Sequence, residues 1–357
     1  MTIALITGSA GLIGSAAARH FAGLGLHVVG VDNDMRRYFF GPDGSTADTA
    51  DRLARDLGSS YTHHHTDIRD RDALRQLFAH YGLDITLVVH TAGQPSHDWA
   101  VREPFTDFDV NATATLNVLE CARRHCDRAA VVFCSTNKVY GDRPNTLPMV
   151  ERGTRWEIDP AHPYADGVTE NMSIDACLHS IFGVGKVAAD IAVQEYGRYF
   201  GMRTATFRCG TLTGPAHAAA ELHGFLAYVM RCAMQRRTYT IYGYQGKQVR
   251  DAIHSDDLVA AFDAYWRDPR PGEVYNMGGG RRANISVQEA IALAEQITGQ
   301  PMTTRYLPNP RVGDHIWWIS NTGKFAQHYP GWKLTYDVPA ILTQIYDANS
   351  DRWVSER

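Results

Sequence analysis

The glycine-rich run TGSAGLIG, at positions 7–14, constrains the fold of this chain more than any other stretch. It places Gly8, Gly11 and Gly14 between a short apolar run, IALIT, and a segment with helical spacing, LIGSAAARHFAGLG. Glycines between a strand and a helix permit a tight turn and let backbone N–H groups approach a pyrophosphate. The run therefore predicts a dinucleotide site, and Leu12 and Ile13, which open the helix, belong to it.

A carboxylate completes the dinucleotide pattern. Asp32 ends the next apolar run, HVVGVD, about 20 residues downstream, where this kind of site places the acid that binds the adenosine ribose. A carboxylate there accepts hydrogen bonds from the ribose hydroxyls and repels a 2′-phosphate, which favours NAD over NADP. We expect Asn33, which follows directly, to line the same part of the site.

Apolar runs and helical segments alternate through the first half of the chain. TLVVHTAG, AAVVFCS and RTATFRCG are typical of buried strands, and DRDALRQLFAHYG, ATATLNVLECARRH and KVAADIAVQEYGRYFG of helices. Continuous apolar strands separated by amphipathic helices predict an α/β fold, a Rossmann-type doubly wound parallel sheet covered on both faces.

The alternation of apolar runs and helical segments becomes less regular later in the chain, where proline and aromatic residues increase. We therefore predict a Rossmann domain and a smaller, interleaved substrate-binding lobe. The Rossmann domain takes residues 1–142 and 179–211, with returning segments near 250–275. The substrate lobe takes mainly residues 143–178 and 212–357.

Composition excludes several classes of protein. The 357 residues carry a formal net charge of −4 with both signs intermixed, so we expect neither a nucleic-acid surface nor a membrane partner. No apolar run is long enough to span a bilayer, and no cleavage-site pattern precedes the first strand. The six cysteines form no CxxC pair, which favours free thiols in a cytoplasmic protein. The tract 63–65, three histidines, is only a compositional cue, and we expect no metal site.

The G-x-x-G-x-x-G spacing resembles the short-chain dehydrogenase/reductase superfamily, and in this length range its extended branch, the NAD-dependent nucleotide-sugar epimerases and dehydratases. HTAG (His90–Gly93) and the helix that contains Asn111 match further motifs of that branch. The resemblance implies NAD as the cofactor. It also implies cofactor-binding roles for Asp67, Ile68, Thr91, Ala92, Gly93, Gln94, Asn111, Ser135, Lys186 and Cys209.

The run STNKVYGD (Ser135–Asp142) narrows the resemblance. The sugar 4,6-dehydratases carry an Asp-Glu acid/base pair where this chain has Asn137 and Lys138, and neither of these is a carboxylic acid. The same run, together with GKQVRD (Gly246–Asp251), is similar to the CDP-sugar 2-epimerases. The resemblance covers nearly the whole chain and implies a nucleotide-sugar substrate.

Position 182 departs from the family pattern. Epimerases of this family use a Tyr-x-x-x-Lys pair, with a Ser or Thr on the neighbouring strand, to move the proton of a sugar hydroxyl. Lys186 and Thr136 match the lysine and the threonine, and Phe182 occupies the place of the tyrosine. A phenyl ring has no proton to give or take.

Three explanations stay open. In the first, the base has moved, the candidates being Tyr164, Asp175, Cys177, His179 and Lys138. A helix that begins only near Ser180 would leave His179 in a loop instead of on the face of Phe182 and Lys186. In the second, Lys186 and Thr136 relay the proton without a dedicated base, at a cost of about 10²–10⁴-fold in rate. In the third, the chain is a non-catalytic module that binds NAD or a sugar nucleotide.

Several residues are expected to meet the substrate. Ser96 and His97 follow the predicted fourth strand, and the carboxyl ends of parallel strands face the ligand crevice. Arg250 and Arg311 match the family's diphosphate-binding arginines, since a planar guanidinium bonds two phosphate oxygens at once. The expected substrate-binding set is completed by Asn137, Lys138 and Phe182.

The leading function is therefore an NAD-dependent nucleotide-sugar epimerase, with a 4-epimerase or a dehydratase with relocated acids as enzyme alternatives. The helices near 113–125 and 183–200 match those that form the family's dimer interface, so the resemblance implies a homodimer. The sequence does not fix the sugar, its nucleotide or the inverted carbon.

Overall fold

The computed structural model describes residues 1–355 with the exception of 218, 220, 222, 223 and 312. The chain divides into two compact units, each assembled from separate stretches of sequence. Unit 1 comprises Met1–Val139, Ile181–Arg208 and Leu258–Tyr275, and unit 2 comprises Tyr140–Ser180, Cys209–Asp257 and Asn276–Arg357.

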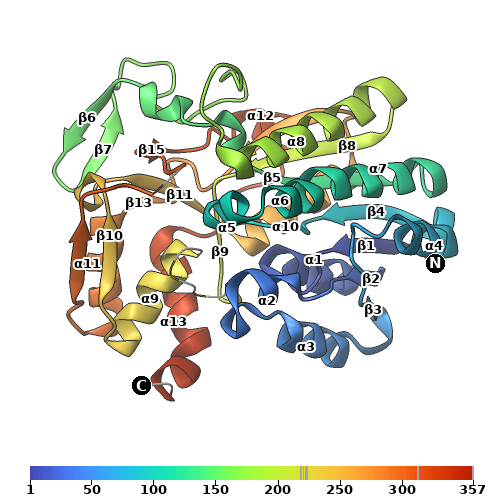
Figure 1. Ribbon diagram of the computed structural model, residues 1–357, viewed down its shortest axis with the longest axis horizontal. Coiled ribbons are helices and arrows are strands. Elements are labelled where there is room, and N and C mark those ends of the chain that lie inside the picture. Colours follow the sequence, from blue (N-terminus) through green and yellow to red (C-terminus); the bar gives the residue numbers. More distant parts are fainter. Residues whose placement is uncertain (218, 220, 222–223, 312, 356–357) are drawn as a thin grey trace. The chain divides into compact units, whose positions relative to one another are not determined.

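A seven-stranded sheet organises unit 1 (Figure 1). Its strands, in order across the sheet, are β12 (Glu273–Met277), β8 (Arg203–Cys209), β5 (Ala130–Thr136), β4 (Ile85–His90), β1 (Ile3–Thr7), β2 (His27–Val31) and β3 (Tyr61–His64). The pairs β3–β2, β2–β1, β1–β4 and β4–β5 are parallel. The order reverses at β1, and such a switch point opens a ligand crevice at the carboxyl ends of the strands. The predicted doubly wound α/β sheet is confirmed.

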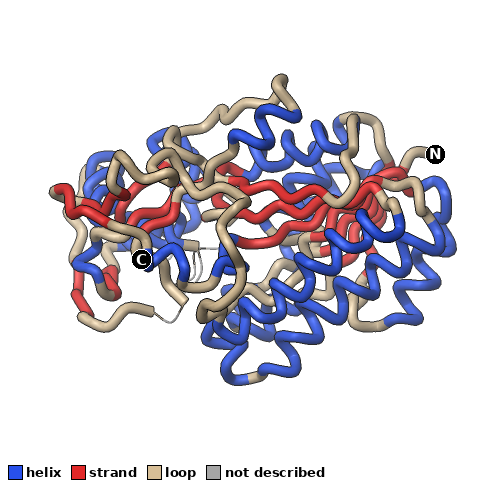
Figure 2. The backbone as a smooth tube through the Cα atoms, turned by 90° about the horizontal axis from the view of Figure 1, so that it is seen from above, coloured by secondary structure: helices blue, strands red, loops and turns tan. Residues whose placement is uncertain are grey.

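Helices lie on both sides of this strand layer (Figure 2). Phe78, Val118 and Val193, from three different helices, belong to one buried cluster with the strands. Phe21 packs edge-on against Trp266, with ring centroids 5.9 Å apart. The helices of this part are α1 (Leu12–Gly23), α2 (Met35–Phe40), α3 (Ala47–Leu57), α4 (Arg71–Tyr81), α5 (His97–Arg102), α6 (Pro104–Phe108), α7 (Ala114–His125), α8 (Ser180–Phe200) and α10 (Ser255–Arg267).

Helix α8 begins at Ser180, so His179 precedes the helix instead of sharing its face. The backbone leading into this helix is strained, because Ala176 and Ser180, the first residue of α8, have positive φ values of 52° and 62°. Residues other than glycine rarely adopt such values. Phe182 and Lys186 both lie inside α8 and are buried. The spacing of four residues places them on one face of the helix.

Unit 2 contains small sheets and a separate apolar core. Its strands are β6 (Met149–Arg152), β7 (Arg155–Ile158), β9 (Thr211–Thr213), β10 (Tyr239–Tyr242), β11 (Val249–His254), β13 (Asn284–Ser286), β14 (Thr304–Leu307) and β15 (Trp317–Trp318). Its helices are α9 (Phe225–Gln235), α11 (Val287–Thr298), α12 (Gly323–His328) and α13 (Val338–Ser355). Ser286 and Glu289 form a capping box that fixes the start of α11. None of the helices in the described part of the chain has the length and apolarity needed to cross a membrane.

Candidate active site

The glycine turn joins β1 to α1 and lies against the loop that follows β4. Gly8 has a φ of +69°, and a Cβ on this residue would lie 2.7 Å from the backbone nitrogen of Ala92. A Cβ on Gly14 would lie 2.0 Å from the carbonyl oxygen of Gly8. Both positions therefore require glycine, which keeps the backbone of the turn accessible to a ligand.

The start of α1 is suited to an anion. Gly11 has an extended backbone just before the helix, and no side chain in the described residues caps this end. The amide groups of Leu12 and Ile13 lie in the first turn, where backbone N–H groups have no partner within the helix. Such an end attracts a pyrophosphate.

Asp32 connects the end of β2 to the glycine turn. Its Oδ2 accepts a hydrogen bond from the Ala10 amide at 3.1 Å, and its Oδ1 accepts from the Asp34 amide at 2.9 Å. The carboxylate is therefore fixed at the carboxyl end of the sheet, where it fits the role of ribose acceptor that the sequence predicted.

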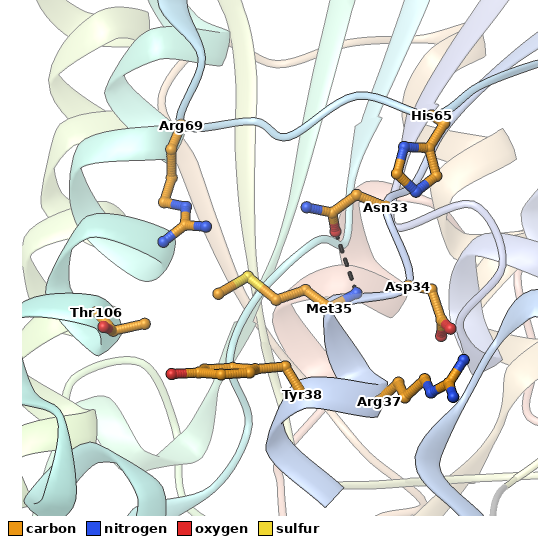
Figure 3. Close-up of a pocket in the computed structure, with 8 residues that line it drawn as sticks. All are labelled: Asn33, Asp34, Met35, Arg37, Tyr38, His65, Arg69 and Thr106. Carbon is orange, nitrogen blue, oxygen red and sulfur yellow. Dashed lines mark hydrogen bonds between the residues drawn. The ribbon is translucent and has the colours of Figure 1, made fainter. Parts of the chain in front are cut away.

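A cavity of about 820 Å³ opens beside Asp32, within unit 1 (Figure 3). Figure 3 shows Asn33 and Arg69 facing each other across it, and the Asn33 side chain accepts a hydrogen bond from the Met35 amide at 3.2 Å. Arg69 is ion-paired with Asp67 at 2.6 Å. Ile68, the residue between them in the chain, is buried. The size and position of the cavity suit the adenosine half of a dinucleotide. Its lining residues are Asn33, Asp34, Met35, Arg37, Tyr38, His65, Arg69 and Thr106.

The loop after β4 is held by a buried hydrogen-bond network. Asn111 accepts from the Gln94 amide at 3.1 Å and donates to the Gln94 carbonyl oxygen at 3.0 Å. The Gln94 side chain donates to Asp107 Oδ1 and to the Ser96 carbonyl oxygen, both at 2.7 Å. Thr91 donates to the Thr7 carbonyl oxygen at 2.8 Å. Gln94 and Asn111 therefore fix the shape of the loop through their side chains.

Asp107 also belongs to this network, although it was not among the predicted site residues. It is 1% exposed, and its Oδ2 has no hydrogen-bond partner among the described residues. Burial raises the pKa of Asp107 to about 6, against the opposing effects of Gln94, Lys186 and Asn111. The four-residue spacing of Asp107 and Asn111 brings them together only once this stretch is helical, and its sequence shows no helical period.

Lys186 reaches the same loop from α8. A Cβ on Gly93 would lie 2.8 Å from Lys186 Nζ and 3.0 Å from Asn111 Oδ1. One turn earlier on the same helix face, the Phe182 ring contacts the His97 imidazole, with centroids 4.7 Å apart and an angle of 56° between the rings. The structure thus brings together five of the predicted site residues at α8, namely Gly93, Asn111, Lys186, His97 and Phe182.

The end of β5 carries the predicted serine and threonine. The Ser135 hydroxyl donates to Asp190 at 2.7 Å inside the unit, where Arg208 also pairs with Asp190 at 2.8 Å. Thr136 Oγ1 lies 3.3 Å from Asn137 Oδ1 and accepts from the Lys138 amide at 3.2 Å. The Ser135 hydroxyl proton is therefore engaged inside the unit, whereas Thr136 is half-buried at the strand end.

The remaining candidates for a displaced base lie in unit 2. His179 Nε2 is 3.6 Å from Cys177 Sγ, and Arg143 donates to the carbonyl oxygen of Asp175. Tyr164 is half-buried in a turn and its ring lies 5.5 Å from that of His162. The predicted cofactor residue Cys209 is 1% exposed at the end of β8.

Asp314 bonds to both predicted diphosphate arginines, to the side chain of Arg250 and to the backbone of Arg311. Arg250 forms an ion pair with Asp314, and the Asp314 amide donates to the Arg311 carbonyl oxygen at 3.2 Å. A phosphate that used both guanidinium groups would compete with this carboxylate for Arg250. Within the described residues, no group of His, Cys, Asp or Glu side chains is arranged to hold a metal ion.

Known proteins share this architecture. The chain is 30% identical over 312 residues to CDP-paratose 2-epimerase from Salmonella typhi, which covers 85% of this chain and 87% of that protein. It is 28% identical over 374 residues to UDP-glucose 4-epimerase from Pisum sativum, which covers 98% of this chain and 96% of that protein.

The fold is also similar to that of a solved structure. UDP-glucuronic acid 4-epimerase from Bacillus cereus, in complex with UDP-glucuronic acid and NAD, matches with a TM-score of 0.79 and 24% identity over 98% of this chain and 99% of that chain. Residues 4–278 match one family throughout. The chain belongs to the NAD dependent epimerase/dehydratase family, which confirms the resemblance and the NAD cofactor predicted from its sequence.

Proposed function

We propose that this chain is an NAD-dependent nucleotide-sugar epimerase that works by transient oxidation of a sugar carbinol, as in the CDP-paratose/CDP-tyvelose 2-epimerases. Two observations support the proposal. Lys186 is held beside Gly93 and Asn111 in the loop after β4, while Asn137 and Lys138 stand where a 4,6-dehydratase needs carboxylic acids. The site thus keeps the lysine that supports oxidation of the sugar, and at positions 137 and 138 it lacks the carboxylic acids that a dehydratase uses to remove water.

The residues of unit 1 would hold NAD along the carboxyl ends of the strands. The start of α1 would bind the pyrophosphate, Asp32 the adenosine ribose, and Lys186 the nicotinamide ribose. When bound there, NAD would supply the reversible hydride transfer by which a sugar carbon is inverted. Thr136 would orient the sugar oxygen, and Arg250 and Arg311 would bind the nucleotide diphosphate.

A homodimer belongs to this proposal. Apolar side chains lie exposed on the two helices that the resemblance assigns to an interface, namely Leu116 on α7 and Ile181, Val184 and Ile191 on α8, each at least 41% exposed. An exposed apolar strip of this kind marks a protein–protein contact. We place the enzyme in the cytoplasm, in keeping with its free cysteines.

Small molecules released by denaturing the freshly purified protein test the proposal first. We expect NAD or NADH near one per chain, and rapid conversion of CDP-paratose to its C2 epimer by the intact protein. Conversion of UDP-glucose to its C4 epimer instead would favour the 4-epimerase alternative. Retained NAD without turnover of any nucleotide sugar would favour the binding module, the reading that Phe182 supports.

A further inference from the structure

We propose that His97 is the catalytic residue that replaces the missing tyrosine as proton acceptor and donor. The inference rests on the proposed function and adds the group that moves the proton. It starts from the contact between His97 and Phe182, whose ring centroids are 4.7 Å apart. In the family pattern, position 182 carries the phenol, so the His97 imidazole packs against the ring that takes the place of the phenol ring.

His97 contacts the face of α8 that carries Phe182 and Lys186. They occupy one face of the helix, and Lys186 Nζ lies close to Gly93, four residues before His97. The loop 93–97 therefore runs along that face, with the lysine at one end and the imidazole at the other. His97 is half-buried, and Phe182 is 5% exposed. The phenyl ring provides an apolar wall against which the imidazole is held.

The loop that carries His97 is fixed in position. Ser96 caps α5, since its Oγ accepts from the Trp99 amide at 3.2 Å, and His97 is the first residue of that helix. Gln94 joins the Ser96 carbonyl oxygen to Asp107 through two hydrogen bonds of 2.7 Å. A reacting group needs such support, because displacement by about 1 Å costs large factors in rate.

The chemistry assigned to His97 is proton transfer in both directions. The O–H bond of the sugar carbinol breaks and an N–H bond forms on neutral imidazole. The electron pair left on oxygen forms the carbonyl as the C–H pair leaves to NAD. When the carbonyl is reduced, the imidazolium returns the proton to oxygen. Histidine suits this cycle because its ordinary pKa of about 6.5 allows both forms near neutral pH.

Four proteins test the inference: wild type, His97→Gln, Phe182→Tyr and the double variant. We expect His97→Gln to lower kcat by about 10²–10⁴-fold with little change in KM and full NAD content. The double variant should regain at least tenfold, because the phenol returns to the family's position. His80→Gln, at the exposed end of α4, is the matched control and should leave kcat unchanged.

A readout independent of turnover accompanies the kinetics. The NMR signal of the His97 imidazole, identified by its loss in His97→Gln, should shift when CDP-sugar is added to the NAD-bound protein. An unchanged kcat in His97→Gln, no gain in the double variant, or no shift of this signal would overturn the inference alone. Absence of turnover by the wild type with every nucleotide sugar would overturn the proposed function and the inference together. If His97→Gln loses NAD, His97→Asn takes its place in the same comparison.

Discussion

Asp107 shows how one buried side chain connects the loop after β4 to the chemistry of the site. Both of its hydrogen-bond donors, Gln94 and Asn111, are themselves almost completely buried. They stabilise the ionised carboxylate, yet the loss of hydration is the larger effect and raises the pKa of Asp107 to about 6. The carboxyl group therefore changes charge in a range that solution measurements reach easily.

The pKa of Asp107 predicts a particular pH dependence of stability. The folded value of about 6 lies above the ordinary value of 3.8, so the fold favours the protonated form. That contribution is full below about pH 4 and is lost as the pH rises through about 6. In the wild type, the free energy of unfolding should therefore decrease between about pH 4 and pH 6. We expect a smaller decrease in Asp107→Asn, measured by urea titration at each pH. The exposed Asp127→Asn control should keep the wild-type slope, and an equal slope in Asp107→Asn would refute the prediction.

Gly14 offers a sharp test of the cofactor site. Alanine at this position would place a methyl group 2.0 Å from the Gly8 carbonyl oxygen, so the turn must move. We expect Gly14→Ala to lose bound NAD and to lower Tm. Gly23, on the same helix, has nothing within 4 Å of an added Cβ. Gly23→Ala should keep NAD and be neutral or more stable by about 0.5–1 kcal/mol. Retention of NAD by Gly14→Ala would contradict this view of the turn.

At the scale of elements, α8 carries two different surfaces. One face buries Phe182 and Lys186, and the other exposes Val184 and Ile191. We expect Val184→Glu combined with Ile191→Glu to convert a dimer into a monomer, because burial of two charges in an apolar interface is costly. Light scattering after size-exclusion chromatography measures the mass. Leu83→Glu, at an exposed apolar site outside α7 and α8, should remain dimeric. A dimer that survives the double substitution would rule out this face.

The elements with regular periodicity were predictable from the sequence. β1, β2, β4, β5 and β8 appear where continuous apolar runs predicted strands, and α1, α4 and α7 where helical spacing predicted helices. The short helices α5 and α6 were not predicted. They fall in GQPSHDWAVREPFTDFDV, where prolines and polar residues leave no period, so capping and tertiary contacts decide the conformation.

In the whole molecule, the residues of the site likewise divide into those that a local motif predicts and those that only the tertiary fold brings together. The NAD half was predictable, because Gly8, Gly14 and Asp32 lie in contiguous motifs whose local geometry requires their residue types. The contact between His97 and Phe182 joins residues far apart in the chain, and it exists only in the folded protein. The roles of residues in unit 2, including Arg250 and Arg311, stay predictions that rest on the family resemblance.

Incubation of CDP-paratose with the purified protein in D₂O, with the sugar followed by NMR, tests whether the protein inverts this sugar by oxidation at C2. Oxidation at C2 with return of the same hydride predicts that the C2 epimer accumulates with no deuterium at C2. Deuterium at C2 would show that the carbon exchanges with solvent. If no epimer forms although the protein retains NAD, epimerase activity on this substrate is contradicted and only NAD binding remains.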